Sequence, residues 1–318
     1  EQYWKSQGVE LKRNTLANWI IRSSQWFKPM YELMLEELLE EDILHTDETE
    51  LRVLKRDGKA TNSMSRMWVF CSGKYSSKPM SLYKYHPTRS AKVVESVLGG
   101  YKGYLQTDGY KSYTHAWRAK RIGCWAHARR KWIDCLPKGI KAEGSKAAQA
   151  LSIVEEIFTV EKGFDGMETE SIYTERIAKI KPLLSKYWEL LEKIDAPKGS
   201  ALDKAVNYSM NNKKELEGFL ADGRLELTNN RAERAVKPFV IARKNFLFSD
   251  TSKGAEASAL CFTMIECAKL NKLDVFGYLI YLLSELPKLG EKPSKQHLIR
   301  MLPWSEDLPE YCKIPKRV

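Results

Sequence analysis

Three acidic residues occupy positions from which carboxylates could hold divalent cations. Asp47 lies inside segment 43–54, which alternates weakly and is rich in strand formers. Asp108 closes a short strand candidate, and Glu233 lies in the first turns of a predicted helix that Thr228 or an asparagine after it would cap. Because active-site groups favour the carboxyl ends of strands in open α/β sheets, the position of Asp108 suits an active-site residue.

Such a set of carboxylates suits phosphodiester chemistry. Two Mg²⁺ ions about 3.5–4 Å apart can activate an attacking oxygen and stabilise a leaving one. Mg²⁺ takes oxygen ligands, usually one or two carboxylates together with water and substrate phosphates. A nuclease site of this kind therefore needs a few acids at one edge of a rigid scaffold, and it needs neither histidine nor cysteine.

Each acid also has an ordinary structural explanation, and the 41 Asp and Glu residues of the chain make chance sets common. Asp47, beside Glu48 and Glu50, could be a solvated acid on a strand face. Asp108 could be a turn residue, because aspartate is common in turns. Glu233 could stabilise the N-terminal end of its helix through the helix dipole. The residues alone leave both explanations open.

The elements that would position these acids form an α/β pattern. The predicted strands cover 43–54, 66–72, 80–85, 104–107 and 121–125. Helices are predicted after Ser90, ended by Gly99 and Gly100, and over 126–136. Three hairpin-type strands followed by alternating helix and strand favour a mixed five-stranded sheet flanked by helices.

The rest of the chain has helical patterns. Residues 1 to about 40 predict a short helix capped by Asn14 and a longer one with an apolar stripe of Trp26, Met30, Leu33, Met34 and Leu38. Residues 138–224 show helical stripes and no strand pattern, so they form an insertion or a second domain. Two further helices are predicted over 253–270 and 274–286.

Several long stretches of the chain are similar to a known family. In chain order they are HTDETELRV (45–53), YHPTRS (85–90), GYLQTDGYKSY (103–113), CWAHARRKW (124–132), NNRAERAVKPFVIARKNFLFS (229–249) and AKLNKLDVFGYL (268–279). They resemble the large transposase of the insertion sequence 66 family, a group of DDE transposases, and they follow that family's order. TLANWI (15–20) resembles the end of its helix-turn-helix region, and LPW (302–304) resembles its C-terminal tail.

The resemblance implies an RNase H-like core with an all-α insertion and helical N-terminal and C-terminal extensions. The expected division is a helical tail of an N-terminal DNA-binding region (1–40), the first part of the catalytic core (41–137), the all-helical insertion (138–224), the second part with the catalytic helix (225–290) and a C-terminal tail (291–318). The chain begins without methionine, and we expect a further N-terminal portion with the family's zinc-binding module.

The resemblance assigns the catalytic and metal-binding roles to the same three acids. The aspartates of the family's DET and DGY motifs are Asp47 and Asp108, and the glutamate of its AER motif is Glu233. The family often has aspartate before the NN pair, where this chain has Thr228. Threonine also caps helices, so we expect this difference to have little effect on the helix that carries Glu233. The expected cofactor is two Mg²⁺ ions, for which Mn²⁺ would substitute.

The expected activity is that of a metal-dependent polynucleotidyl transferase from a bacterial insertion sequence. Water would cleave DNA at the element ends, and the freed 3′-OH would attack target DNA. The expected partners are the terminal inverted repeats, target DNA, a second copy of the chain in a homodimer, and accessory proteins of the same element. Other hypotheses are an inactive DNA-binding relic, another RNase H-like nuclease acting on junctions or RNA–DNA hybrids, and a structural α/β scaffold.

The charge of the chain agrees with a polyanionic partner. Lys and Arg number 52 and the acids 41, so the net charge is 52 − 41 = +11 and the pI is about 9.2. Basic residues gather in two clusters, Arg118, Lys120, Arg121, Arg129, Arg130 and Lys131, and Arg231, Arg234, Lys237, Arg243 and Lys244. DNA phosphate contacts are expected from Arg129, Arg130, Lys131, Arg234, Lys237, Arg243 and Lys244. The alternative is a solvated basic face.

A short cysteine and histidine pattern lies between the second acid and the insertion. Cys124, His127 and Cys135 begin a zinc-binding pattern, but structural zinc needs four ligands. We therefore expect a buried thiol and a polar histidine near DNA. His45 is expected on a strand surface, with support of a metal ligand as the alternative. Core packing rather than base stacking is expected of the nearby rings, Trp125, Trp132 and Phe246.

Composition sets further limits on the class of protein. The six cysteines are scattered, which favours a reducing compartment over a disulfide framework. No run of about 18 apolar residues and no signal-peptide core is present, so no membrane partner is expected. The predicted location is the bacterial cytoplasm, in association with the nucleoid.

Overall fold

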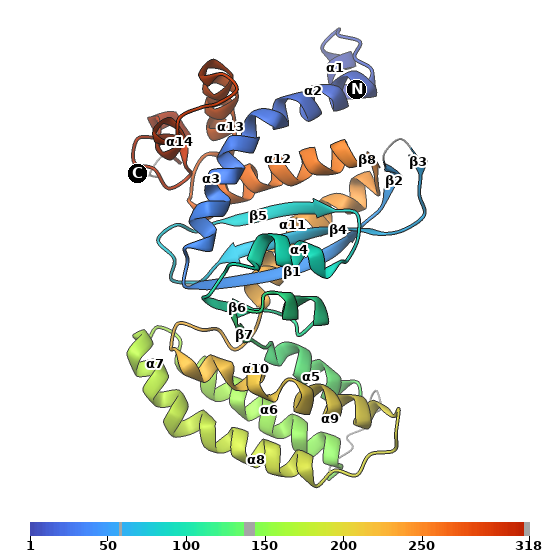
Figure 1. The fold of residues 1–318 in the computed structure, drawn as a ribbon, viewed down its shortest axis with the longest axis vertical. Coiled ribbons are helices and arrows are strands. Elements are labelled where there is room, and N and C mark those ends of the chain that lie inside the picture. Colours follow the sequence, from blue (N-terminus) through green and yellow to red (C-terminus); the bar gives the residue numbers. More distant parts are fainter. Residues whose placement is uncertain (57–58, 137–143, 315–318) are drawn as a thin grey trace.

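A five-stranded sheet forms the centre of the chain, of which a computed structural model describes residues 1–56, 59–136 and 144–314 (Figure 1). Its order is β5-β4-β1-β6-β7. The strands are β1 (Ile43–Leu51), β4 (Ser65–Ser72), β5 (Ser81–His86), β6 (Tyr104–Gln106) and β7 (Lys120–Ile122). β4 pairs antiparallel with β1 and β5, whereas β6 pairs parallel with β1 and β7. The expected mixed five-stranded sheet flanked by helices is confirmed.

The first strand is shorter than the sequence predicted. β1 ends at Leu51, and β2 (Val53–Arg56) leaves the main sheet to pair with β3 (Lys59–Ala60) and β8 (Ser249–Thr251). Neither β3 nor β8 was predicted, because such short runs show no alternating pattern. The residues expected in the core of this segment are fully buried, namely Leu44, Leu51 and Val53.

Helices cover both faces of the sheet, because alternate residues of a strand point to opposite faces. One face, with Leu44 and Trp68, packs against α3 (Lys28–Leu39) and α4 (Ala91–Leu98). The other face, with Met67 and Val69, packs against α11 (Asn230–Phe246) and α12 (Ser252–Leu270). Since α11 carries Glu233, only the second face can share a site with that acid.

The parallel half of the sheet begins with the predicted helix α4. The Ser90 side chain accepts a 3.2 Å hydrogen bond from the Lys92 N–H, which confirms the predicted cap. The prediction for the last strand was wrong at its end, because Trp125 belongs to α5 (Trp125–Ile133) and not to a strand. The chain leaves the sheet at Gly123, whose N–H donates to the Glu215 carbonyl instead of a neighbouring strand.

A helical region follows α5 and lies beyond the β7 edge of the sheet (Figure 1). It contains α6 (Lys146–Lys162), α7 (Thr169–Glu175), a π-helical turn η3 (Arg176–Ile180), α8 (Lys181–Glu192), α9 (Ala201–Asn211), α10 (Lys213–Glu217) and the 3-10 turn η4 (Gly218–Ala221). Two buried indoles of α5 bond to this region. Trp132 Nε1 donates to Tyr187 Oη at 2.7 Å, and Trp125 Nε1 donates to the Leu216 carbonyl at 2.7 Å.

The N-terminal and C-terminal elements lie beyond the β5 edge of the sheet (Figure 1). The N-terminal elements are α1 (Gln2–Ser6), α2 (Arg13–Ser24) and η1 (Gln25–Phe27), and the C-terminal ones are α13 (Val275–Glu285), η5 (Leu286–Leu289), α14 (Lys295–Met301) and η6 (Glu310–Cys312). Two predictions were wrong here. Asn14 lies inside α2, for which Lys12 is the cap residue. Trp26 is 43% exposed, because the tighter 3-10 turn rotates it away from the buried stripe of α3.

No helix within the described ranges is both long and apolar enough to cross a membrane.

Candidate active site

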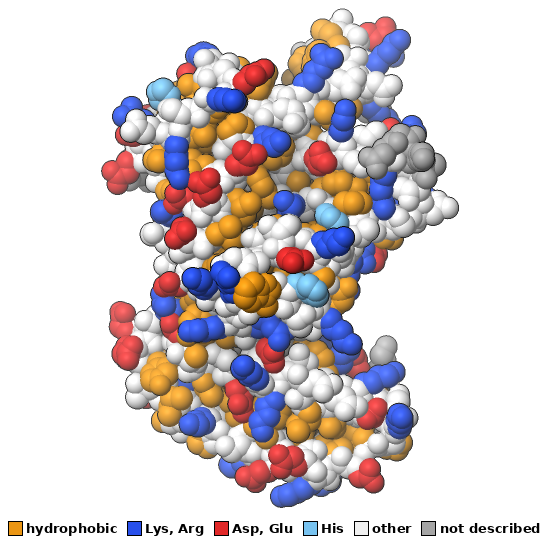
Figure 2. All heavy atoms as spheres, viewed as in Figure 1, with side chains coloured by type: hydrophobic (Ala, Val, Ile, Leu, Met, Phe, Trp, Pro, Cys, Tyr) orange, Lys and Arg blue, Asp and Glu red, His pale blue; other side chains and the backbone are white. Residues whose placement is uncertain are grey.

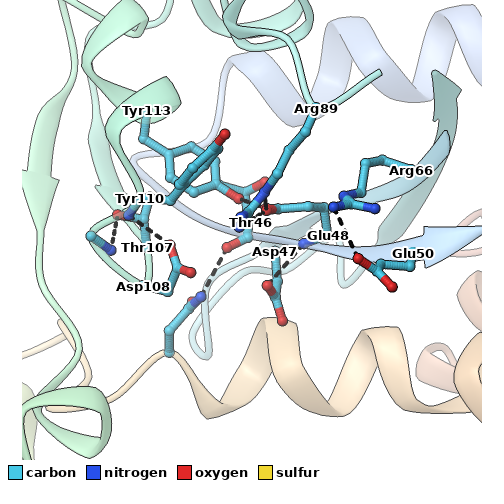
Figure 3. A network of polar contacts seen from close by, with 12 residues as sticks. Thr46, Asp47, Glu48, Glu50, Arg66, Arg89, Thr107, Asp108, Tyr110 and Tyr113 are labelled. Carbon is cyan, nitrogen blue, oxygen red and sulfur yellow. Dashed lines mark hydrogen bonds and ion pairs between the residues drawn. The ribbon is translucent and has the colours of Figure 1, made fainter. Parts of the chain in front are cut away.

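The register of two neighbouring strands places Asp47 and Asp108 on the same face of the sheet. In the parallel pair β1 and β6, His45 lies opposite Gln106. Asp47 and Asp108 each lie two residues further along the chain, so their side chains share a face. Figure 3 shows both carboxylates projecting toward α11.

The first turn of α11 brings Glu233 to this face, because α11 packs across β1 and β4. The other two acids contribute to the pKa of Asp47. Burial is the largest cause that raises this pKa to about 7, and the negative charges of Glu48, Asp108 and Glu233 raise it further. A 2.8 Å hydrogen bond from the Glu48 N–H to Asp47 Oδ1 acts in the opposite direction. The charges of Asp108 and Glu233 therefore both act on Asp47.

Asn229 fastens the start of α11 to β1. It occupies the predicted cap position, but its side chain does not cap the helix. Instead Nδ2 donates to the Thr46 carbonyl at 2.8 Å, and Oδ1 lies 3.1 Å from His45 Nδ1. The Asn229 N–H donates to Cys124 Sγ at 3.2 Å. One fully buried residue thus joins β1, the start of α5 and the helix that carries Glu233.

His45 is buried, so its predicted place on a strand surface was wrong. Its Nε2 lies 3.2 Å from Glu226 Oε2. Burial favours a higher pKa for Glu226, but contacts with His45 and Arg231 outweigh it and lower the pKa to about 2. The Gln106 side-chain amide donates to the Glu226 carbonyl. The segment before α11 therefore contacts His45 near the start of β1 and Gln106 at the end of β6, an arrangement for which the sequence held no signal.

The turn at Asp108 contacts the helical region. Gly109 has a φ of +85°, which only glycine adopts without strain. A Cβ there would also lie 3.3 Å from Tyr208 Oη and 3.2 Å from Asn212 Oδ1. Tyr208 donates its hydroxyl to the Asp108 carbonyl at 3.0 Å, and the Tyr110 N–H donates to Asp108 Oδ1 at 2.9 Å. Helix α9, far along the sequence, therefore helps to hold the second acid.

Glu48 forms a polar network on the opposite face of β1, shown in Figure 3. It accepts 2.5 Å hydrogen bonds from Arg89 Nε and from the Tyr113 hydroxyl. The Arg89 guanidinium lies 3.5 Å from the centre of the Tyr110 ring. Burial raises the pKa of Glu48, although Tyr113 and Arg89 oppose this shift. The network ties the turn after Asp108 to β1, and no local sequence pattern indicates that these residues pair.

Cys124 and His127 lie beside Glu233. Cys124 is the cap residue of α5 and is fully buried, as expected, and His127 is one turn further. His127 Nδ1 lies 3.8 Å from Glu233 Oε1, and both atoms are buried without a hydrogen-bond partner among the described residues. Burial lowers the pKa of His127 and favours its neutral form, while Asp108 and Glu233 act in the opposite direction. Cys124, His127 and Glu233 form a group of side chains that could hold a metal ion, and Cys135 does not belong to it.

A family model described as "Transposase IS66 family" matches residues 1–257, which is more than half of the chain. The chain belongs to the IS66 transposase family. Similar proteins include uncharacterized proteins y4jD and y4qI of Sinorhizobium fredii (strain NBRC 101917 / NGR234), 30% and 28% identical to this IS66-family chain over 320 residues. Both alignments cover 96% of this chain, but 61% of y4jD and 58% of y4qI. The chain therefore spans about three-fifths of the length of these relatives.

Most basic residues expected to contact DNA lie at the surface of this IS66-family chain. They belong to α5 and α11, and the exposed ones are Arg130, Lys131, Arg234, Lys237 and Lys244. Arg129 is half-buried and pairs with Glu155 at 2.6 Å, and Arg243 donates to the Glu50 carbonyl. Figure 2 shows Lys and Arg spread over one face, with several at the narrow middle of the molecule. The surface there is mixed in charge, since acids lie between them.

The aromatic residues near the IS66 motifs contribute to the core. Trp125 and Trp132 are fully buried, which confirms the expectation of core packing. Phe246 is partly buried, and its ring centre lies 5.8 Å from that of Phe239.

Proposed function

We propose that this chain carries the catalytic centre of a DDE transposase with an RNase H-like core, a metal-dependent polynucleotidyl transferase. Asp47, Asp108 and Glu233 are the proposed catalytic and metal-binding residues. The observation that carries the proposal is the parallel register of β1 and β6, which directs Asp47 and Asp108 to the face that α11 covers. The strand order, three antiparallel strands joined to two parallel ones, supports the RNase H-like core.

The donor atoms at this face suit hard divalent cations. All three proposed ligands are carboxylates, the ligand type that Mg²⁺ and Mn²⁺ accept. The other two acids contribute to the raised pKa of Asp47. Glu233 Oε1 is buried and has no hydrogen-bond partner among the described residues. A cation would relieve both conditions. When bound, two Mg²⁺ ions would supply activation of an attacking oxygen and stabilisation of a leaving one.

The protein's part in the reaction is to hold its acids and the DNA in place. The Glu48 and Tyr110 N–H groups orient the carboxylates of Asp47 and Asp108, while α11 carries Glu233. Hydrolysis at an element end would free a 3′-OH, and this group would then attack target DNA. Basic residues of α5 and α11 would contact phosphates on either side. Because two ends must be joined, we propose a homodimer acting at the nucleoid, assisted by accessory proteins of the same element.

Cleavage and strand transfer on DNA that carries the element ends test this proposal. With Mg²⁺ or Mn²⁺, the single variants Asp47→Asn, Asp108→Asn and Glu233→Gln are each expected to lose at least about a hundredfold in rate, since loss of even an outer contact to a metal ligand costs about 10–100-fold. Glu50→Gln is the matched control, because Glu50 lies on β1 but is exposed and pairs with Arg66 at 3.1 Å. Full strand transfer by Asp47→Asn would overturn the assignment.

The same assay separates the other hypotheses. Cleavage of four-way junctions or RNA–DNA hybrids in preference to element ends would indicate another RNase H-like nuclease. DNA binding without metal-dependent cleavage would indicate an inactive relic. Neither DNA binding nor Mn²⁺ binding near Asp47 would be expected of a structural scaffold.

A further inference from the structure

A second group of metal-ligating side chains adjoins the three acids. Cys124 Sγ, one ring nitrogen of His127 and one carboxylate oxygen of Glu233 all lie within 4.8 Å of one another. The first two come from the start of α5, and the third comes from the first turn of α11. Asn229 fixes these two helix starts against each other, because its backbone N–H donates to Cys124 Sγ. The three side chains are therefore held close by rigid elements.

Two atoms of this group lack the partners that burial requires. His127 Nδ1 and Glu233 Oε1 face each other at 3.8 Å, too far for a hydrogen bond, and neither has another partner among the described residues. A tetrahedral zinc ion with bonds of about 2.0–2.1 Å to N and O and about 2.3 Å to S spaces its ligands about 3.3–3.6 Å apart. Rotation of these side chains closes the remaining difference. A cation would then satisfy both buried atoms.

The types of ligand decide which cation would bind. Thiolate and imidazole favour zinc, cobalt and similar ions, whereas Mg²⁺ binds oxygen almost exclusively. Three protein ligands leave a fourth position for water, which is the arrangement of open zinc sites. As the metal–sulfur bond forms, the Cys124 thiol would release its proton to solvent. Glu233 is the one ligand that this group shares with the proposed carboxylate site.

We propose that Cys124, His127 and Glu233 form a zinc site that competes for Glu233 with the hard-metal site. Only the shared use of Glu233 rests on the proposed function, because the geometry of the three side chains stands without it. Zinc bound here would withdraw Glu233 from Asp47 and Asp108 and so inhibit the proposed reaction.

Cobalt titration of the whole 318-residue chain tests the site without any activity assay. Co²⁺ at one equivalent is expected to give the thiolate-to-cobalt charge-transfer band and the visible bands of a tetrahedral ion, and Zn²⁺ is expected to displace it. Cys124→Ser should abolish the charge-transfer band, because its hydroxyl can still accept the Asn229 N–H but supplies no thiolate. Cys135→Ser is the matched control and should keep the band, since Cys135 is a partly exposed cysteine of the same segment.

Two further variants make every outcome decisive. His127→Ala, at a side chain that is 25% exposed, should weaken Co²⁺ binding at least about tenfold, and it decides the matter if Cys124→Ser does not fold. Asp47→Asn should keep the band, because Asp47 belongs only to the carboxylate site. A band that is absent from the wild type, that survives in Cys124→Ser, or that is unaffected by His127→Ala would overturn the zinc site. A chain that gives the cobalt band but does not bind Mn²⁺ would support the zinc site and contradict the carboxylate site. A chain that binds Mn²⁺ but gives no cobalt band would contradict the zinc site alone.

Competition at Glu233 has its own measurement. One equivalent of Zn²⁺ should release Mn²⁺ from the wild type, detected by the return of the free Mn²⁺ signal in electron paramagnetic resonance. The same addition should leave Mn²⁺ bound in Cys124→Ser. Retention of Mn²⁺ by the zinc-loaded wild type would contradict the shared use of Glu233.

Discussion

Asn229 Nδ2 donates a 2.8 Å hydrogen bond to the Thr46 carbonyl, across 183 positions of sequence. Both residues are fully buried, and the oxygen of the same amide lies 3.1 Å from His45 Nδ1. An asparagine amide offers a donor and an acceptor in one plane, so it fixes the direction as well as the position of its neighbours. Glu233 follows one turn into α11, and its place relative to Asp47 therefore depends on this bond.

Asn229→Ala is expected to destabilise the chain and to slow the proposed reaction. The Thr46 carbonyl and His45 Nδ1 would lose their partner, and each unpaired buried polar group costs about 1–3 kcal/mol. A lower urea midpoint and a cleavage rate reduced at least about tenfold are expected, because a misplaced active-site group can cost about a hundredfold. Asn230→Ala is the control, since Asn230 is the exposed neighbour. Equal urea midpoints for the two variants would show that the bond does not anchor α11.

Tyr208→Phe should separate positioning of Asp108 from overall stability. The Tyr208 hydroxyl donates to the Asp108 carbonyl at 3.0 Å, and its removal should cost only about 0.5–1.5 kcal/mol of unfolding free energy. We expect a lower kcat and a weaker affinity for Mn²⁺ with unchanged DNA affinity, because the turn at Asp108 would lose its contact with α9. The exposed Tyr173 provides the control, and Tyr173→Phe should behave as the wild type. An unaltered Mn²⁺ affinity in Tyr208→Phe would show that the helical region does not help to position Asp108 for metal binding.

The central sheet could be predicted from the sequence because its strands are bounded by strong local signals. Ser90 caps α4 as its type and position suggest, and buried Leu44 and Leu51 give β1 its pattern. Errors arose where tertiary contacts decide the boundary. Trp125 was placed in a strand, but the neighbouring Gly123 bonds to the Glu215 carbonyl, which lies 92 positions away. No local pattern contains that contact.

The same distinction applies to the site. Asp47 and Asp108 could be selected because each lies in or after a recognisable strand, and the register of β1 with β6 then directs both to the same face of the sheet. His45 was misjudged, because its burial depends on Asn229 and Glu226, which lie far along the chain. The relation of Cys124 and His127 to Glu233 was missed for the same reason: their spacing of three residues resembles the start of a zinc pattern, but the neighbouring carboxylate comes from another helix.

The partly buried carboxyl of Asp47 predicts a stability change that depends on pH and on metal. Its folded-state pKa of about 7 exceeds the usual 3.8, so the folded chain holds a proton that the unfolded chain has lost. Stability should therefore fall as pH rises from about 4 to about 7, and this loss should be absent from Asp47→Asn. In metal-free buffer at pH 8, Asp47→Asn is expected to have the higher Tm.

Addition of Mn²⁺ should reverse that order. A ligand at 100 times its Kd stabilises the folded state by about 2.7 kcal/mol, so the Tm of the wild type should rise. Asp47→Asn should respond little, and Glu50→Gln should respond as the wild type does. Equal shifts in the wild type and Asp47→Asn would show that Mn²⁺ binds elsewhere.

The exposed basic residues at the end of α5 predict how DNA binding depends on salt. Arg130 and Lys131 are exposed in its last turn, whereas Arg129 of the same helix pairs with Glu155 at 2.6 Å. Each phosphate contact releases condensed counterions, so removal of one contact should reduce the slope of log K against log salt by about 1. Arg130→Gln and Lys131→Gln should each show this reduction in a titration of duplex DNA at several salt concentrations. Arg129→Gln should change the slope less, because its guanidinium is already paired, and unchanged slopes in both exposed variants would place the DNA on another face.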